Sequence, residues 1–327
     1  MRWRAAAYGR CLNCDPGKEA LLLSMRLVFT QILVILLYVA VGFVAGKARL
    51  ILPEQRKYLS GLCSNLILPF TILSAASQDV DGRDMAALLA AMLFTLALYL
   101  CVTGASLAYH RAKRAPKGMR AVCTSLLTYP NCTFLGLPLC RALFGEMAVL
   151  YNLSALIAFN GLFFTLQYGL FTGDGMNLKK LLTPAMLSTA AVIAMLVARL
   201  HFPDPVQTVC SGVGSMITPL SLIIIGVMLS ESRIVETLRE KRSWLIALLR
   251  NLVIPLLALP ALRLLPMGAD ARLCVLVYLA CPCATLTSIY AIKCDTEPEF
   301  AAHAVLLSTL LFAATLPAII AIGQAFL

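Results

Sequence analysis

The sequence predicts an all-α polytopic membrane protein, with ten transmembrane helices arranged as two inverted five-helix repeats. Three features support this fold class: the composition, ten apolar segments of membrane-spanning length, and prolines that recur at matching places in the two halves. Of the 327 residues, 60% are hydrophobic and 13% are charged, whereas a soluble domain has about 45–50% apolar and about 25% charged residues. This composition excludes a water-soluble globular protein and a disordered chain.

Ten apolar segments account for most of the chain. A transmembrane helix needs roughly 20 residues, so 327 residues hold ten spans with short loops and leave no room for a second, soluble domain. We expect the spans at 27–46, 58–77, 85–109, 119–143, 148–171, 181–200, 209–230, 243–265, 271–293 and 301–326.

The basic residues predict the orientation of these spans. Sixteen Lys and Arg lie in the loops that follow odd-numbered segments, and five lie in the other loops. Because cytoplasmic loops carry the excess of Lys and Arg, we expect a multi-pass protein of the cell membrane with both termini outside. The net charge of +11 then reflects topology and requires no nucleic-acid partner.

The N-terminal residues 1–24 do not fit this orientation. They carry four basic residues and lack the apolar stretch and cleavage site of a signal peptide. We treat 1–24 as a leader outside the first repeat, with Met25 as an alternative start. Cys11 and Cys14 in this leader are a lone pair, and two cysteines alone do not predict a metal or redox site. The other ten cysteines lie in or beside apolar segments, where thiols usually behave as small apolar residues.

Prolines divide the remaining chain into two similar halves, 25–175 and 176–327. Pro69 and Pro219 lie 150 residues apart in the second and seventh segments, and Pro130 and Pro282 lie 152 residues apart in the fourth and ninth. Matched breaks in corresponding segments indicate an inverted-repeat transporter and its binding site. The alternative is a chance alignment, because proline is common in membrane helices.

The fourth and ninth segments are expected to be broken near mid-membrane, since proline removes a backbone N–H and clashes with the preceding turn. The second half-helix of each would point free N–H groups and a partial positive charge at the membrane centre, which suits an anion. The alternative is a pair of proline kinks packed inside a bundle. The candidate substrate-binding residues are Pro130, Asn131, Cys132, Thr133, Pro282, Cys283 and Thr285.

Three polar residues within other spans have two interpretations each. Asn65 and Asn160 are either polar contacts between helices or cavity lining, and Asn65 is the better cavity candidate because it precedes Pro69 by one turn. Arg250 either extends its charge to the inner interface or provides a cationic contact for an anion.

The acidic residues predict the mode of coupling. All 16 lie in the leader, in loops or at the ends of spans, so a proton or sodium site built on a buried carboxylate is not visible. Neutral oxygens at Asn65, Ser215 or Thr218 could still bind sodium. The distribution favours a carrier driven by gradient and voltage, since a monoanion leaving the cell gains about 2.3 kcal/mol per 100 mV.

Motifs for catalysis and cofactor binding are incomplete. The segment Gly42–Lys47 has the wrong glycine spacing for a phosphate loop. Cys281-Pro-Cys283 stands without the phosphorylated aspartate motif and the cytosolic domain of a heavy-metal pump. The three histidines lie at the edges of spans and do not form a protease site. We expect no enzyme, no cofactor and no metal.

Several strings resemble the auxin efflux carrier family, specifically its prokaryotic permeases such as malate and malonate permeases. These are NCTFLGLP (131–138), TPLSLIIIG (218–226), RNLVIP (250–255), and ACP (280–282) followed by Ser308 to Pro317. The resemblance covers the chain from about residue 27 to its end. It implies two inverted five-helix repeats with crossed, broken helices 4 and 9, a fold similar to bile-acid/sodium symporters.

The same resemblance implies a mechanism. Scaffold helices 1, 2, 6 and 7 would hold transport helices 3–5 and 8–10, which move as an elevator and carry organic anions. Asn131 matches the asparagine that contacts the substrate carboxylate in plant members. The sequence lacks the long cytosolic loop of many plant members, and its Cys-Pro-Cys in helix 9 is unusual.

We therefore predict a secondary transporter, an exporter or uniporter, of small organic anions such as carboxylates. Its expected partners are that anion and the lipid bilayer, and a homodimer is left open. The alternatives are a non-transporting sensor or scaffold on the same fold, a sodium- or proton-coupled dicarboxylate importer, and a channel for neutral solutes.

Overall fold

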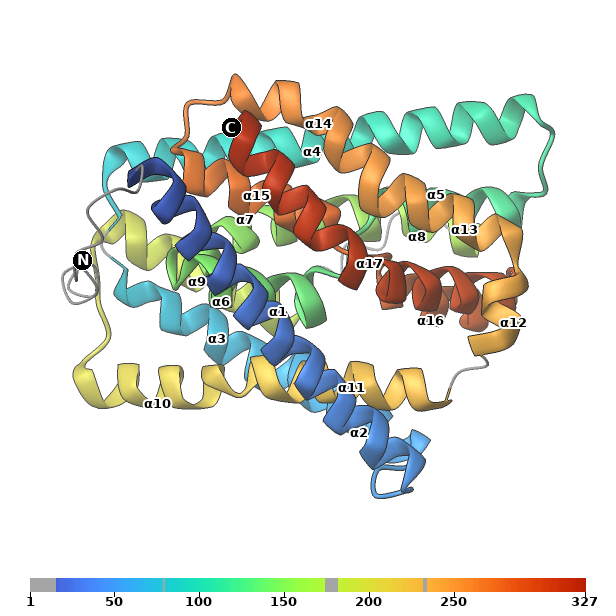
Figure 1. Ribbon diagram of the computed structural model, residues 1–327, viewed down its shortest axis with the longest axis horizontal. Coiled ribbons are helices and arrows are strands. Elements are labelled where there is room, and N and C mark those ends of the chain that lie inside the picture. Colours follow the sequence, from blue (N-terminus) through green and yellow to red (C-terminus); the bar gives the residue numbers. More distant parts are fainter. Residues whose placement is uncertain (1–15, 79, 174–181, 232–233) are drawn as a thin grey trace.

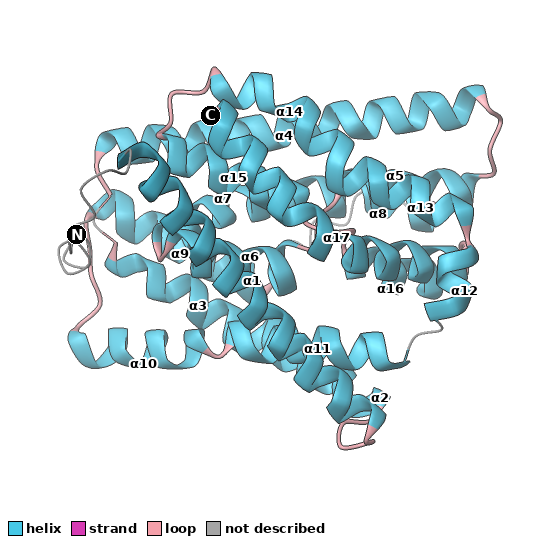
Figure 2. Ribbon diagram, viewed as in Figure 1, coloured by secondary structure: helices cyan, strands magenta, loops and turns pink. Residues whose placement is uncertain are grey.

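The computed structural model describes residues 16–78, 80–173, 182–231 and 234–327. Helices form nearly all of this part of the chain, and it contains no strand (Figure 2). Six helical stretches are long and apolar enough to cross a membrane, and they confirm a polytopic all-α membrane protein. They are Pro53–Ser77, Gly82–Ala112, Met147–Thr172, Asp204–Glu231, Lys241–Arg263 and Pro298–Phe326.

The helices follow one another along the chain with short connections. The first half contains α1 (Pro16–Lys47), α2 (Pro53–Leu62), η1 (Cys63–Ile67), α3 (Leu68–Ser74), η2 (Ala75–Ser77), α4 (Gly82–Ala112), α5 (Lys117–Thr128), η3 (Cys132–Gly136), α6 (Leu137–Phe144), α7 (Met147–Leu162), η4 (Phe163–Gln167) and α8 (Tyr168–Thr172). The second half contains α9 (Pro184–Ala198), α10 (Asp204–Ser215), α11 (Ile217–Glu231), α12 (Ile234–Arg239), α13 (Lys241–Leu248), η6 (Leu249–Val253), α14 (Ile254–Arg263), α15 (Ala269–Ala280), α16 (Thr285–Lys293) and α17 (Pro298–Phe326).

The described residues of the ten predicted apolar segments are largely helical, and six of the helical stretches meet the length and hydropathy of a membrane span. At the start of the chain the structure differs from the prediction, because α1 begins at Pro16 and not at residue 27. Residues 16–24 of the expected leader are thus continuous with the first helix, while residues 1–15, including Cys11 and Cys14, lie outside the described residues.

Three prolines shape their helices without breaking them. Pro69, Pro138 and Pro255 each lie two residues after a wider π-helical turn, namely η1, η3 and η6. The ring of proline clashes with the carbonyl four residues earlier, and a π turn is one way for a helix to accommodate an extra residue there. Pro69 therefore does not interrupt its span: the chain is helical from Pro53 to Ser77.

The helices pack as two groups (Figure 1). In the first, α1 packs along α11, while α3 contacts α9 and α10. Glycines allow the closest approach, because a Cβ on Gly42 would collide with the backbone of Ile223 and one on Gly226 with the backbone of Val39. In the second group, α4 packs on α5 and α7, while α17 packs on α13, α15 and α16.

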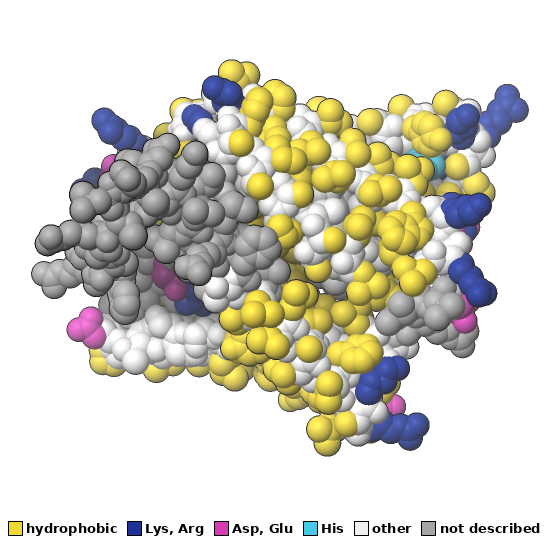
Figure 3. All heavy atoms as spheres, in the orientation of Figure 1, with side chains coloured by type: hydrophobic (Ala, Val, Ile, Leu, Met, Phe, Trp, Pro, Cys, Tyr) yellow, Lys and Arg dark blue, Asp and Glu magenta, His cyan; other side chains and the backbone are white. Residues whose placement is uncertain are grey.

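The surface has an apolar belt and a basic end. Hydrophobic side chains cover the middle of the face in Figure 3, and Lys and Arg gather toward its right-hand end, where α2, α12 and the α4–α5 connection lie. The start of α1 and the end of α17 lie toward the opposite end of the molecule (Figure 1). Such a belt is typical of a protein surrounded by lipid.

Candidate functional site

The two segments that contain Pro130 and Pro282 are interrupted, and their interruptions are in contact. Helix α5 ends at Thr128 and α15 ends at Ala280. Between them runs a short antiparallel bridge that pairs Pro130 with Cys283. The backbone N–H of Asn131 donates to the carbonyl oxygen of Pro282 at 2.7 Å, and the N–H of Ala284 donates to the carbonyl oxygen of Tyr129 at 3.0 Å. The predicted breaks therefore exist, and the two broken segments cross there.

The bridge provides hydrogen bonds to backbone groups that a continuous helix would have paired. Unwound backbone at membrane depth must find partners within the protein. A third contact fixes the crossing from a neighbouring helix, because the N–H of Cys283 donates to Oγ of Ser308 in α17 at 3.1 Å. Asn251 in η6 donates in turn to the carbonyl oxygen of Ser308 at 2.6 Å.

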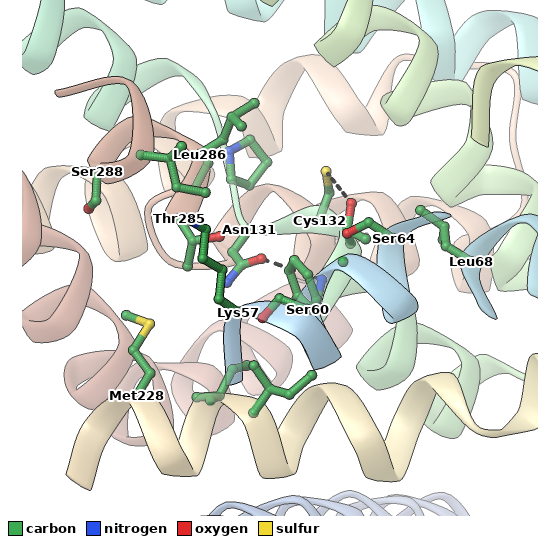
Figure 4. Close-up of a pocket in the computed structure, with 18 of the residues that line it drawn as sticks. Lys57, Ser60, Ser64, Leu68, Asn131, Cys132, Met228, Thr285, Leu286 and Ser288 are labelled. Carbon is green, nitrogen blue, oxygen red and sulfur yellow. Dashed lines mark hydrogen bonds between the residues drawn. The ribbon is translucent and has the colours of Figure 1, made fainter. Parts of the chain in front are cut away.

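A cavity of about 680 Å³ lies at this crossing (Figure 4). Its lining includes six of the substrate-binding residues predicted from the sequence: Asn65, Pro130, Asn131, Cys132, Thr133 and Thr285. Asn160, for which two interpretations were open, also lines it. The other walls are largely apolar and include Leu68, Leu156, Phe159, Phe164, Ile224, Ile225, Met228, Leu286 and Ile289.

Hydrogen-bond donors face the cavity from both broken segments. Oδ1 of Asn131 accepts from the N–H of Phe134 at 3.4 Å and caps the second half-helix. The amide nitrogen of the same side chain has no hydrogen-bond partner among the described residues. The backbone N–H groups of Thr285 and Leu286 likewise donate to no group in the described part of the chain. These donors lie at the N-terminal ends of helical segments, where the partial charge is positive. They suit a carboxylate or another oxyanion.

A polar stripe on the second span forms the opposite wall. Lys57, Ser60, Gly61, Ser64 and Asn65 line the cavity and follow the spacing of one helix face, three or four residues apart. Sequence reasoning missed Ser60 and Ser64. Their signal was present, since small and polar residues recur with helical period inside an otherwise apolar segment.

Charged groups from α2 and α11 also line the cavity. Arg56 in α2 and Glu231 at the end of α11 form an ion pair, with Nε and Oε2 3.0 Å apart. Lys57 lies beside them and is exposed. Glu231 is the one carboxylate among the lining residues, so the described wall around the crossing itself is neutral apart from helix-end partial charges.

Three candidate residues lie outside the cavity lining. Pro282 and Cys283 are buried in the bridge, where they stabilise the crossing by backbone pairing with the other broken segment. Arg250 is 1% exposed. The interpretation that its charge extends to the membrane interface is therefore wrong, and its guanidinium is enclosed by protein.

The described residues contain no group of three or more His, Cys, Asp or Glu side chains arranged to hold a metal ion. The ten cysteines in this part of the chain are free thiols. Sγ of Cys140 lies 3.8 Å from the carbonyl oxygen of Cys274, and this weak contact joins the two broken segments.

Broken helices that cross inside an apolar bundle, next to a cavity with a polar stripe, are typical of a multi-pass membrane transporter. Residues 27–181 and 170–320 match the family model described as membrane transport protein. The chain thus belongs to this family, the auxin efflux carrier family, as the resemblance indicated. Its members are transporters rather than enzymes. A search among curated proteins finds no match.

Proposed function

We propose that the protein is a secondary carrier of small organic anions, with carboxylates as the preferred class, and that the anion binds at the crossing of the two broken segments. The observation that supports this is the convergence of the Asn131 amide with the free N–H groups of Thr285 and Leu286 in one cavity. A carboxylate bound there gains several hydrogen bonds and favourable helix-end partial charges without a counter-ion.

Inverted repeats account for the symmetry of the site. Each half contributes a twelve-residue helix, α5 or α15, that ends at the crossing. Each then continues with a second half-helix, and the two bridge hydrogen bonds run in opposite directions between the same two segments. This arrangement supports ten spans in two halves, 25–175 and 176–327, whose odd number of spans inverts the second half.

Alternating access follows from where the cavity lies. One wall comes from α2, η1 and α11, which belong to the group that packs around α1. The other comes from η3, α7 and α16, which belong to the group that packs around α4 and α17. Movement of the second group as a transport unit against the first as a scaffold would carry the crossing and its anion across the membrane.

The orientation completes the proposal. The lining of the cavity includes Arg56 and the exposed Lys57, which lie at the end where basic residues gather. The positive-inside rule assigns that end to the cytoplasm, so this conformation is inward-facing, in the cell membrane, with both termini outside. Export of a monoanion from this state gains about 2.3 kcal/mol per 100 mV of inside-negative potential.

Flux measured in proteoliposomes under an imposed potential tests the proposal. We expect uptake of radiolabelled malate or malonate to change with voltage, and Asn131→Ala to reduce it by about tenfold. Asn152→Ala is the matched control, because Asn152 is equally buried but does not line the cavity.

Each alternative has its own outcome. Binding without flux supports a sensor, and flux that requires sodium or a proton gradient supports a coupled importer. Flux of neutral solutes only, unchanged by Asn131→Ala, contradicts the anion site.

A further inference from the structure

Arg250 is a cation held inside the protein without an acidic partner. It lies in η6, is 1% exposed, and its Nε and Nη2 atoms make no hydrogen bond among the described residues. The ion pairs found in the described part of the chain join Arg56, Arg141 and Arg242 to glutamates, and Arg250 is in none of them. A buried charge without compensation is strongly unfavourable, so the surroundings of Arg250 must supply negative potential.

The surroundings of Arg250 belong to the crossing. Its segment, η6, packs against α5, α15 and α17. Asn251, the next residue in η6, donates to the carbonyl oxygen of Ser308, and the hydroxyl of Ser308 accepts the N–H of Cys283 in the bridge. Arg250 therefore lies at the interruption of the ninth span, although it does not line the cavity.

The negative potential available there comes from the backbone. Helices α5 and α15 both end at the crossing, and the last carbonyl groups of a helix have no partner within it. Each helix C-terminus carries a partial charge of about −0.5, so two of them together approximate one negative charge. Pro130 and Pro282, which lack an N–H, cannot pair with these carbonyls.

Carriers with broken helices commonly place a coupling cation against such C-terminal ends and unwound carbonyls. We propose that Arg250 is a fixed internal cation that takes this role: its guanidinium neutralises the C-terminal ends of α5 and α15 and makes the crossing independent of a bound metal ion. Arg250 is thus a positioning residue that stabilises the crossing and does not contact the transported anion. The transport part of this inference rests on the proposed function, whereas the stabilising part does not.

Thermal unfolding of the purified protein in detergent tests the stabilising part directly. Arg250→Lys keeps the positive charge, whereas Arg250→Met keeps a long unbranched side chain and removes the charge. We expect the lysine variant to melt close to the original protein and the methionine variant to melt about 5 °C lower or more. Arg263→Gln at the exposed end of α14, in the same span, is the control; it loses only an exposed contact with the ring of Phe326 and should melt close to the original protein.

Equal melting of both Arg250 variants overturns the inference. If neither is destabilised, the charge is unnecessary; if both are destabilised alike, packing rather than charge is what Arg250 contributes.

Ion replacement tests the transport part. The original protein should carry the anion equally well when choline replaces sodium, whereas Arg250→Ala should lose about tenfold in flux and regain part of it with millimolar guanidinium. A sodium requirement in the original protein, or no rescue of Arg250→Ala by guanidinium, contradicts the inference. If the original protein moves no anion at all, the proposed function fails, and the melting comparison still decides the role of Arg250.

Discussion

The backbone N–H of Asn131 donates a 2.7 Å hydrogen bond to the carbonyl oxygen of Pro282, across 151 positions of sequence. This bond and its counterpart from Ala284 to Tyr129 use the main chain of Asn131, while Oδ1 of its side chain caps the following half-helix. One residue therefore joins the two halves of the chain, begins a helical segment and presents an amide to the cavity. These three roles can be separated by substitution.

Asn131→Asp separates capping from anion binding. Aspartate caps a helix about as well as asparagine does, and the backbone bond to Pro282 does not depend on the side chain. The carboxylate, however, replaces the amide donors and repels an anion. We expect a melting temperature near that of the original protein, together with a loss of malate or malonate affinity of about tenfold or more, measured by ligand-induced thermal stabilisation and by flux.

Retained affinity in Asn131→Asp would show that the anion does not approach this side chain. Asn131→Ala complements the test, because it removes the cap as well and should also lower the free energy of unfolding by the cost of a lost cap, about 1 kcal/mol.

Ser308→Ala tests the hydrogen bond between α17 and the crossing. The hydroxyl of Ser308 is fully buried and accepts the N–H of Cys283. Its removal leaves that N–H buried and unpaired, which costs about 1–3 kcal/mol. Thr309→Ala is the matched control, since Thr309 Oγ1 donates only to the carbonyl oxygen of Val305 within its own helix. Thermal unfolding of the two variants in the same detergent should rank Ser308→Ala below Thr309→Ala, and the reverse order would contradict this role.

The positions of the breaks were predictable because proline imposes them by covalent structure. Pro130 and Pro282 cannot donate a hydrogen bond, and both segments are interrupted beside them. Pro69 has the same covalent structure, yet its helix widens into η1 and continues. The choice between a break and a π turn depends on whether the neighbouring backbone finds other partners, as Pro130 does beside Cys283. That information lies in the second half of the chain and is not visible locally.

The burial of Arg250 could not be predicted for a related reason. Its distance from the end of its span suggests a route to the membrane interface, but hydropathy gives only depth in the membrane. Whether a side chain faces lipid or protein depends on the helices around it, and η6 is surrounded by α5, α15 and α17. The cavity-lining serines of the second span illustrate the opposite case, because their helical spacing alone indicated one polar face.

Gly42→Ala tests the close packing of the first helix group. A Cβ at this position would collide with the backbone of Ile223, so α1 and α11 would have to move apart. Overpacking of this kind costs typically about 1–3 kcal/mol. Gly104→Ala in α4 is the control, since nothing lies within 4 Å of the added carbon. We expect a lower melting temperature for Gly42→Ala only, and equal melting of the two variants would show that this contact does not limit stability.

Ser64→Trp tests whether the cavity, rather than the surrounding surface, admits the substrate. Ser64 lines the cavity from the second span, and its neighbour Leu66, which is 46% exposed, does not line it. An indole at Ser64 would fill space opposite Asn131 without altering any of the donor groups at the crossing. Leu66→Trp adds the same ring on another face of the same helix and is the matched control.

We expect Ser64→Trp to abolish thermal stabilisation by malate or malonate and to reduce flux by about tenfold or more, while Leu66→Trp behaves like the original protein. The physical reason is steric: the anion must enter a volume of about 680 Å³ to reach the amide of Asn131 and the N–H group of Thr285. Equal binding by the two variants would mean that the anion reaches the membrane centre by another route, and the site at the crossing would then have to be abandoned.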